Sequence, residues 1–255
     1  MAAGTGTVPL RRVSVRPRRP RQRRWGRRLL RVLLALVVLL ALLVGAGWVL
    51  TPSVDDAPQQ VAAFLTRHDA PALSGAVPGR LAEALIATED SRFRSNPGVD
   101  PVSLLRAPWT LLTGQDPGGA TLEQQLAKNL YENGDHSGLQ QVAELFLALK
   151  LDQSFSKDEL LRLYLDDGYY GHGFYGLTAA TKGYFGVAPA QLTWAQSTLL
   201  AGLFQAPTAY DPLVHPDAAR ARQAHVLDRL VAVGALTRAQ ADAVAAQPWG
   251  LRGGG

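Results

Sequence analysis

The chain has 255 residues, no cysteine and a formal net charge of +5, with 26 Lys and Arg against 21 Asp and Glu. Eleven arginines lie at or before Arg31 and every acidic residue follows it, so the rest of the chain carries 15 basic and 21 acidic side chains. The positive charge therefore belongs to the N-terminal tail, which excludes a nucleic-acid-binding function based on overall charge. Without cysteine, the chain forms no disulfide and must be held by an ordinary hydrophobic core.

The N-terminal region divides into a basic tail and an apolar stretch. Residues 1–28 are polybasic, with no acid and no apolar periodicity, which predicts a disordered cytoplasmic tail. Residues 29–50 are predicted to be a transmembrane signal anchor, because Val32 to Leu50 are 19 residues without a charge and about 20 cross a bilayer. A cleaved signal peptide has a shorter apolar stretch. The arginines before the span predict that the N-terminus is cytoplasmic and the rest of the chain is outside.

The remainder of the chain is predicted to be all-α, with one domain over residues 58–247. Apolar residues recur there at three- and four-residue spacing, and alternating strand patterns are scarce. Capping boxes that begin at Ser156, Thr193 and Thr237 mark three helix starts. A long segment with several Pro and Gly, residues 94–119, is typical of a functional or mobile loop. Helices are predicted at 80–90, 121–132, 139–152, 157–167, 189–204, 217–233 and 237–247.

The stretch ATEDSRFRSNPGVD, residues 87–100, places two acids side by side where a helix gives way to a loop. These acids are Glu89 and Asp90. Solvated helix ends are rich in acids, so the pair by itself does not define a site.

The stretch GGATLEQQLAKNLY, residues 118–131, combines a Gly-rich turn with a capping box from Thr121 to Gln124. Local pattern alone favours a plain helix start. A Gly-rich turn into a helix N-terminus is also an anion site, because free N–H groups and the helix dipole face a negative ligand. Lys128 follows two turns later and would add a full positive charge.

The stretch LQQVAELFLALKLD, residues 139–152, is apolar nearly all round, which predicts a central, buried helix. Gln140, Gln141 and Glu144 form one narrow polar stripe on it. A buried carboxylate at Glu144 would have a raised pKa, which suits acid or base chemistry. A glutamate at a solvated seam is the alternative interpretation.

These three stretches together resemble the peptidoglycan glycosyltransferases, glycosyltransferase family 51. The motif E-D-x-x-F-x-x-H-x-G is matched at Glu89, Asp90, Phe93 and Gly98, with Asn96 in place of the histidine. The motif R-K-x-x-E keeps its glutamate as Glu144, whereas Gln140 and Gln141 replace the basic pair. The motif G-G-S-T-x-x-Q-Q-x-x-K-N is matched, with Ala120 for the serine, at Gly118, Gly119, Thr121, Gln124, Gln125, Lys128 and Asn129.

The match continues downstream and covers about residues 60–235. SKDELLRLYLDDGYYGHGFYGLTAATKGYFG follows the family's S-K-x-x-I-L-x-x-Y-L-N…Y-F-G-x-G-x-Y-G pattern, with Asp166 for the usual asparagine. LTWAQSTLLAGLFQAPTAYDP follows its L-A-G-L-P-Q-A-P segment. Five ordered motifs do not plausibly recur by chance.

The resemblance implies a lysozyme-like, two-lobed helical domain behind one N-terminal transmembrane helix. It implies an inverting transfer in which a lipid II hydroxyl attacks the lipid-linked glycan and lipid pyrophosphate leaves. Glu89 would be the general base, and Glu144 would assist departure of the pyrophosphate, directly or through a divalent metal. The other matched positions, with Asp90 helping to position the site, would bind substrate; they are Asp90, Phe93, Asn96, Gly118, Gly119, Thr121, Gln124, Gln125, Lys128, Asn129, Gln140 and Gln141.

The same resemblance implies partners and a location. The partners are lipid II, the growing lipid-linked glycan, the membrane and other cell-wall synthesis proteins, with no nucleic acid. No cofactor is obligatory and no metal is held by the protein itself, although Mg²⁺ or Mn²⁺ on the substrate pyrophosphate is compatible with it. The location is the bacterial inner (plasma) membrane, with a single pass and an extracytoplasmic catalytic domain. Apolar residues of the 99–112 loop would enter the membrane interface or pack inside the protein.

Two other functions remain open. Loss of the basic pair at residues 140 and 141 removes charge that would stabilise a leaving pyrophosphate, where hydrogen bonds to charged groups contribute about 1.5–3 kcal/mol each. A weakened homologue that binds lipid II or cell-wall synthesis partners without turnover is therefore the alternative. A lysozyme-like glycan hydrolase is a third interpretation, which the motifs of a synthase family disfavour.

Overall fold

The computed structural model describes residues 1–4, 22–101, 120–131 and 138–252. Two compact units divide the chain, Met1–Ala46 and Gly47–Gly255. Gly118 and Gly119, and the 99–112 loop beyond Pro101, lie outside the described residues.

The first helix, α1, spans Gln22–Leu50. Among the described residues, it alone is long and apolar enough to cross a membrane, with a mean hydropathy of 2.9 over its apolar part. Its start at Gln22 shows that the prediction of a disordered tail to residue 28 is wrong for the last seven residues. Arginine is a good helix former, so the helix continues from the apolar span back into the basic segment.

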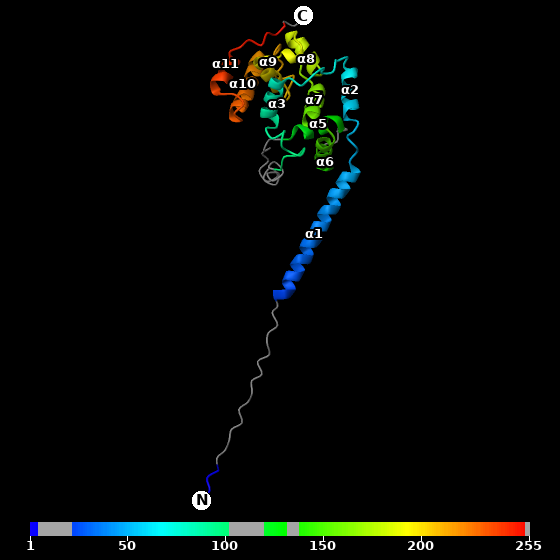
Figure 1. Ribbon diagram of the computed structural model, residues 1–255, viewed down its shortest axis with the longest axis vertical. Coiled ribbons are helices and arrows are strands. Elements are labelled where there is room, and N and C mark those ends of the chain that lie inside the picture. The colour runs from blue at the N-terminus through cyan, green and yellow to red at the C-terminus, as the bar shows by residue number, and fades with distance from the viewer. Residues whose placement is uncertain (5–21, 102–119, 132–137, 253–255) are drawn as a thin grey trace. The chain divides into compact units, whose positions relative to one another are not determined.

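The second unit is built from helices in chain order (Figure 1). Within the described residues, the only β-structure is one isolated bridge between Tyr169 and Tyr175. The all-α prediction is therefore confirmed there. The two-lobed, lysozyme-like arrangement stays a prediction. The helices are α2 (Ala57–Arg67), α3 (Gly79–Glu89), α5 (Leu122–Tyr131), α6 (Gly138–Ser154), α7 (Lys157–Asp166), α8 (Leu177–Phe185), the 3₁₀ turn η1 (Pro189–Gln191), α9 (Trp194–Leu203), α10 (Pro216–Ala232) and α11 (Arg238–Ala245).

The predicted capping boxes form as expected. The side chains of Ser156, Thr193 and Thr237 each accept a hydrogen bond from the backbone N–H three residues later. The glutamate or glutamine at that position accepts in turn from the backbone N–H of the N-cap residue. One prediction is wrong in detail, because the run 189–204 is not a single helix. The turn η1 ends at Gln191, Leu192 has non-helical backbone angles, and Thr193 is the N-cap of the separate helix α9.

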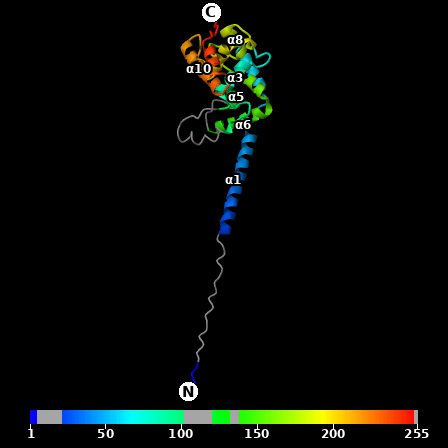
Figure 2. The same ribbon diagram turned by 60° about the vertical axis from the view of Figure 1, so that its left-hand side comes forward.

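The core is centred on α9, whose residues from Ala195 to Leu203 are all buried. Helices α3 and α10 pack against α9 and against each other, and α5 packs on α6. Both views of the ribbon show α5 and α6 side by side (Figures 1 and 2). These two groups of helices place the ends of α3, α5 and α7 next to one another, where the candidate site lies.

Helix α6 is not buried throughout, which corrects the prediction of a central helix. Leu147, Ala148 and Leu151 in its second half are buried, whereas Leu139 is 84% exposed and Val142 is 49% exposed. The second half packs because the chain at Gly98 passes closely over it: a Cβ on Gly98 would lie 2.4 Å from the carbonyl oxygen of Ala148. Apolar sequence alone cannot distinguish a helix that faces protein from one that faces a lipid interface.

Candidate active site

The turn after α3 is set by Asp90. The helix ends at Glu89, and Asp90 leaves helical geometry with φ −148° and ψ 82°. Its side-chain Oδ1 accepts from the backbone N–H of Arg92 at 3.2 Å, and its carbonyl accepts from the N–H of Phe93 at 2.9 Å. An aspartate that bonds the backbone two residues on stabilises a turn in place of further helix. Glu89 is thereby held as the last residue of α3.

Glu89 faces an arginine from a distant helix. Arg222 of α10 donates from Nη2 to Oε1 of Glu89 at 3.1 Å, and the two side chains are 11% and 18% exposed. Burial raises the pKa of Glu89, while the charge of Arg222 and a hydrogen bond from the Gln125 side chain oppose the rise. A carboxyl group with a raised pKa accepts a proton more readily near neutral pH, as a general base requires.

Arg222 itself is fixed by α9. Its Nε donates to the carbonyl oxygen of Gly202 at 3.2 Å, and a Cβ on Gly202 would lie 3.0 Å from its Cγ. The glycine therefore leaves room for the arginine stem. Sequence reasoning missed Arg222, because it is one of several arginines on α10 and has no spacing signal that links it to Glu89.

Gln125 and Tyr164 complete the surroundings of Glu89. Tyr164 donates from its hydroxyl to Oε1 of Gln125 at 2.7 Å, and Nε2 of Gln125 donates to the carbonyl of Ala120 at 3.4 Å. The Gln125 side chain also lowers the pKa of Glu89. The pKa of Tyr164 lies well above its ordinary value, chiefly through burial and then through the charges of Glu89 and Asp167. Tyr164 therefore stays a neutral donor to Gln125.

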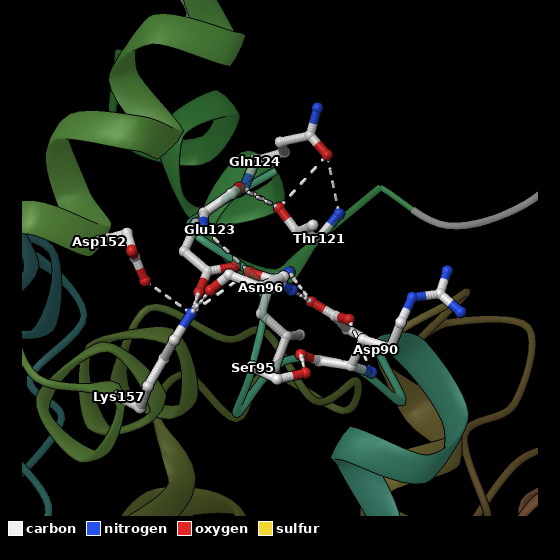
Figure 3. A network of polar contacts seen from close by, with 11 residues as sticks. Asp90, Ser95, Asn96, Thr121, Glu123, Gln124, Asp152 and Lys157 are labelled. Carbon is white, nitrogen blue, oxygen red and sulfur yellow. Dashed lines mark hydrogen bonds and ion pairs between the residues drawn. The ribbon is translucent and has the colours of Figure 1, made fainter. Parts of the chain in front are cut away.

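Asp90 is buried, with 8% exposure, and faces Asn96 in a network of polar contacts (Figure 3). It accepts from Asn96 Nδ2 at 2.8 Å and from the backbone N–H of Leu122 at 3.3 Å. Burial raises the pKa of Asp90, and the hydrogen bonds from Asn96, Leu122 and Arg92 and the charge of Lys157 oppose the rise. Asp90 thus joins the turn after Glu89 to the N-terminus of α5.

Three of the matched positions are buried, and their predicted role in substrate binding stays a prediction. Phe93 is fully buried, Asn96 is 6% exposed and Thr121 is 1% exposed. The Thr121 hydroxyl donates to the carbonyl of Gly98 at 2.6 Å. The polar side-chain atoms of Asn96 and Thr121 are hydrogen-bonded within the protein, and Phe93 packs in the core.

The other matched residues of α5 have mixed positions. Gln124 accepts from the N–H of Thr121 at 2.9 Å, which completes the predicted capping box. Lys128 is exposed, and Asn129 donates from Nδ2 to Oδ2 of Asp167 at 3.0 Å. Burial raises the pKa of Asp167 to about 6, with Asn129 and Arg67 lowering it. Asp167 was not among the predicted residues.

Glu144 lies on α6, the helix that packs on α5, and is half-buried. Gln140 is half-buried and Gln141 is exposed one turn before it. Glu144 therefore lies on a separate helix from Glu89, and its role in catalysis stays a prediction. Within the described residues, no group of three or more His, Asp and Glu side chains could hold a metal ion, and a divalent cation on the substrate stays a prediction.

Known proteins match most of the second unit. The Transglycosylase family model matches residues 59–231. A putative transglycosylase of Cupriavidus necator is 35% identical over 179 residues, which cover 70% of this chain and 78% of that protein. Penicillin-binding protein 1A of Escherichia coli is 38% identical over 184 residues, or 71% of this chain and 22% of that protein.

Two more matches have the same character. Penicillin-binding protein 1F of Bacillus subtilis is 35% identical over 200 residues, or 78% of this chain and 28% of that protein. The crystal structure of penicillin-binding protein 1A from Haemophilus influenzae is 22% identical with a TM-score of 0.42, covering 69% of this chain and 17% of that one. This chain therefore spans about a quarter of the length of the penicillin-binding proteins of Escherichia coli and Bacillus subtilis.

The chain belongs to the transglycosylase family, the peptidoglycan glycosyltransferases of family 51. The resemblance of its motifs is confirmed at that level, and an enzyme of this class is what the family and its named members support.

Proposed function

We propose that the protein polymerises lipid II into peptidoglycan glycan strands by inverting glycosyl transfer, with release of lipid pyrophosphate. The observation that carries the proposal is the state of Glu89: a largely buried acid at a helix end, with a raised pKa, held by Arg222 and Gln125. Such a carboxylate suits the general base of an acceptor hydroxyl, a role worth about 10²–10⁴-fold in rate.

In the proposed reaction, Glu89 takes the proton of the acceptor 4-hydroxyl as its oxygen attacks the anomeric carbon. The bond from that carbon to the lipid pyrophosphate breaks, and the pyrophosphate leaves with the bonding electrons. Inversion needs the base on the face opposite the leaving group. Glu144 on α6 would then assist the departing pyrophosphate from a separate helix, whereas Asp90 is turned inward and stays a positioning residue.

The charge on the departing group is the weak point of the site. Lys128 is an exposed cation on α5, but the amides Gln140 and Gln141 stand where the family motif has a basic pair. This observation favours a second candidate function, a homologue that binds lipid II or cell-wall synthesis partners without turnover.

Membrane attachment by α1 supports the use of lipid-linked substrates. The exposed apolar residues Leu139 and Val142 lie in the first half of α6. Further along α6, Lys150 donates to the carbonyl of Thr51 at 2.7 Å and lies 5.4 Å from the ring of Trp48 at the end of α1. Aromatic and basic residues are typical anchors of a membrane interface. We propose a single-pass plasma-membrane protein with a cytoplasmic N-terminus and residues 52–255 outside.

Polymerisation of purified lipid II by the full chain in detergent, with and without Mg²⁺, tests the proposal. Glycan strands made by the wild type but not by Glu89→Gln would support it. Tight binding of lipid II without strands would favour the non-catalytic function, and release of sugars from finished sacculi would indicate a hydrolase.

A further inference from the structure

A lysine next to the turn after Glu89 is held by four oxygen contacts. Lys157 Nζ lies 2.6 Å from Oε1 of Glu123 and 2.6 Å from Oδ1 of Asp152. It also donates to the backbone carbonyl of Asn96 at 2.8 Å and approaches the side-chain oxygen of Asn96 at 3.3 Å (Figure 3). The ring of Phe93 lies 4.7 Å from the same nitrogen. Residues from α5, α6, α7 and the turn therefore meet at one cation.

Glu123 depends on this lysine. Its side chain is fully buried, and its Oε2 has no hydrogen-bond partner among the described residues. Burial raises the pKa of Glu123, while Lys157 lowers it through a hydrogen bond and its charge. A buried carboxylate is costly without a partner, and removal of one member of a buried pair leaves the other uncompensated.

The lysine contributes to the orientation of the Asn96 amide. The Asn96 side-chain oxygen faces two donors, Lys157 Nζ at 3.3 Å and the backbone N–H of Gly98 at 2.9 Å. Its Nδ2 must therefore point the other way, where it donates to Asp90 at 2.8 Å. A reversed amide would place N–H groups against both donors, so the orientation is unique.

Asp90 connects Asn96 to the segments on either side of Glu89. Its carboxylate holds the turn that follows Glu89 through Arg92 and holds the first residue of α5, Leu122. One turn later, α5 carries Gln125, whose side chain lowers the pKa of Glu89. The contacts of Asp90 therefore hold both the turn that follows Glu89 and the helix that carries Gln125.

We propose that Lys157 and Glu123 are positioning residues for glycosyl transfer, acting through Asn96 and Asp90 to hold Glu89 against the acceptor hydroxyl. This inference rests on the proposed function. Neither side chain touches substrate: Glu123 is enclosed, and the ammonium of Lys157 is occupied by protein oxygens. Their effect should therefore fall on turnover and not on substrate affinity.

Three variants separate positioning from stability: Lys157→Met, Glu123→Gln and the double variant. Because a misplacement of about 1 Å can cost about 10²-fold in rate, we expect Lys157→Met to lower kcat by at least about tenfold, with KM within about twofold. Glu123→Gln should lower kcat less, because Asp152 and Asn96 still hold the lysine. The double variant should melt at a higher temperature than Lys157→Met, because a neutral amide replaces the buried carboxylate that has lost its partner. Its kcat should nevertheless be no higher than that of Lys157→Met.

Asp158→Asn is the matched control. Asp158 follows Lys157 on α7 and forms an ion pair at 2.5 Å with Arg94, which lies in the turn after Glu89. The side chain of Asp158 is 78% exposed. Its kcat should stay within about twofold of wild type, because an exposed pair contributes little. Recovery of kcat together with melting temperature in the double variant would overturn the proposal, as would an equal loss of kcat in Asp158→Asn.

A second measurement does not depend on turnover. Amide hydrogen exchange over Gly98 and Leu122, whose N–H groups bond Asn96 and Asp90, should be faster in the double variant than in wild type and unchanged in Asp158→Asn. Unchanged exchange in the double variant would overturn the positioning role. If wild type itself failed to polymerise lipid II, the proposed function would fall, and this exchange measurement would still decide whether the cluster orders the turn.

Discussion

Arg222 and Glu89 form an ion pair across 3.1 Å although 133 residues of chain separate them. The arginine reaches the acid because α10 packs on α3 and because Gly202 of α9 leaves space for its stem. The pair gives Glu89 one fixed partner in a largely buried position. It also opposes the rise in the pKa of Glu89 that burial causes.

Removal of this arginine should shift the pH profile. Arg222→Met takes away a charge that lowers the pKa of Glu89, so that pKa should rise further. A general base works only when deprotonated, so the acid limb of kcat/KM should move to higher pH and activity should be lost first at the acidic end. Arg222→Lys, which keeps the charge, should shift the limb less. Rates of lipid II polymerisation measured from pH 5 to pH 9 check both variants, and an unmoved limb in Arg222→Met would contradict the coupling.

Glu89→Gln should abolish polymerisation and leave the fold intact, because the change is nearly isosteric and removes the base. The loss should be about 10²-fold or more, measured as strand formation alongside an unchanged circular dichroism spectrum, which shows that the variant is folded. Substantial activity in the folded variant would show that another group takes the proton.

Asp90→Asn should act differently, because Asp90 is buried and accepts from Asn96 and Leu122. An amide there presents N–H groups to at least one existing donor, so the variant should lose about 1–3 kcal/mol of stability. Its activity, corrected for the folded fraction, should fall less than that of Glu89→Gln. A variant with wild-type stability and no activity would instead make Asp90 a catalytic residue.

How much of this site the sequence could predict depended on the range of each interaction. The cap from Thr121 to Gln124 and the helix that ends at Glu89 were predictable, because they are decided within four residues. The partnership of Glu89 with Arg222 was not, since it depends on how α3, α9 and α10 pack. Likewise, a motif position such as Phe93 cannot reveal whether it faces the ligand or the core.

The pKa of about 6 for Asp167 predicts a pH-dependent stability. An aspartate with a raised folded pKa costs stability when charged, so this cost is present above pH 6 and is relieved as the pH falls through 6 towards the ordinary value near 4. Asp167→Asn should therefore gain about 1 kcal/mol relative to wild type between pH 5 and pH 8. Denaturant unfolding of the full chain in detergent at both pH values tests it, with the exposed Asp217→Asn as control. A difference that does not change with pH would contradict the assignment.

The two glutamines before Glu144, Gln140 and Gln141, are positions where basic side chains can be introduced. Gln141 is exposed and Gln140 is half-buried, so longer side chains can be accepted there without repacking of the core. The same helix offers a matched control at its other end, where Gln153 and Ser154 are also exposed. Arginine and lysine at either pair of positions add the same charge to α6.

The double change Gln140→Arg, Gln141→Lys should raise lipid II turnover, because two cations would stabilise charge that grows on the leaving pyrophosphate in the transition state. The control Gln153→Arg, Ser154→Lys should leave kcat within about twofold, because its charges lie more than two helical turns from Glu144. If the protein is a non-catalytic binder, the first pair should tighten binding of pyrophosphate and create no turnover. Lost activity would mean that the site works with neutral amides and that its positive charge comes from elsewhere. Steady-state kinetics of wild type and both variants on lipid II, at matched salt, distinguish these outcomes, and equal stimulation by both pairs would show a general effect of charge.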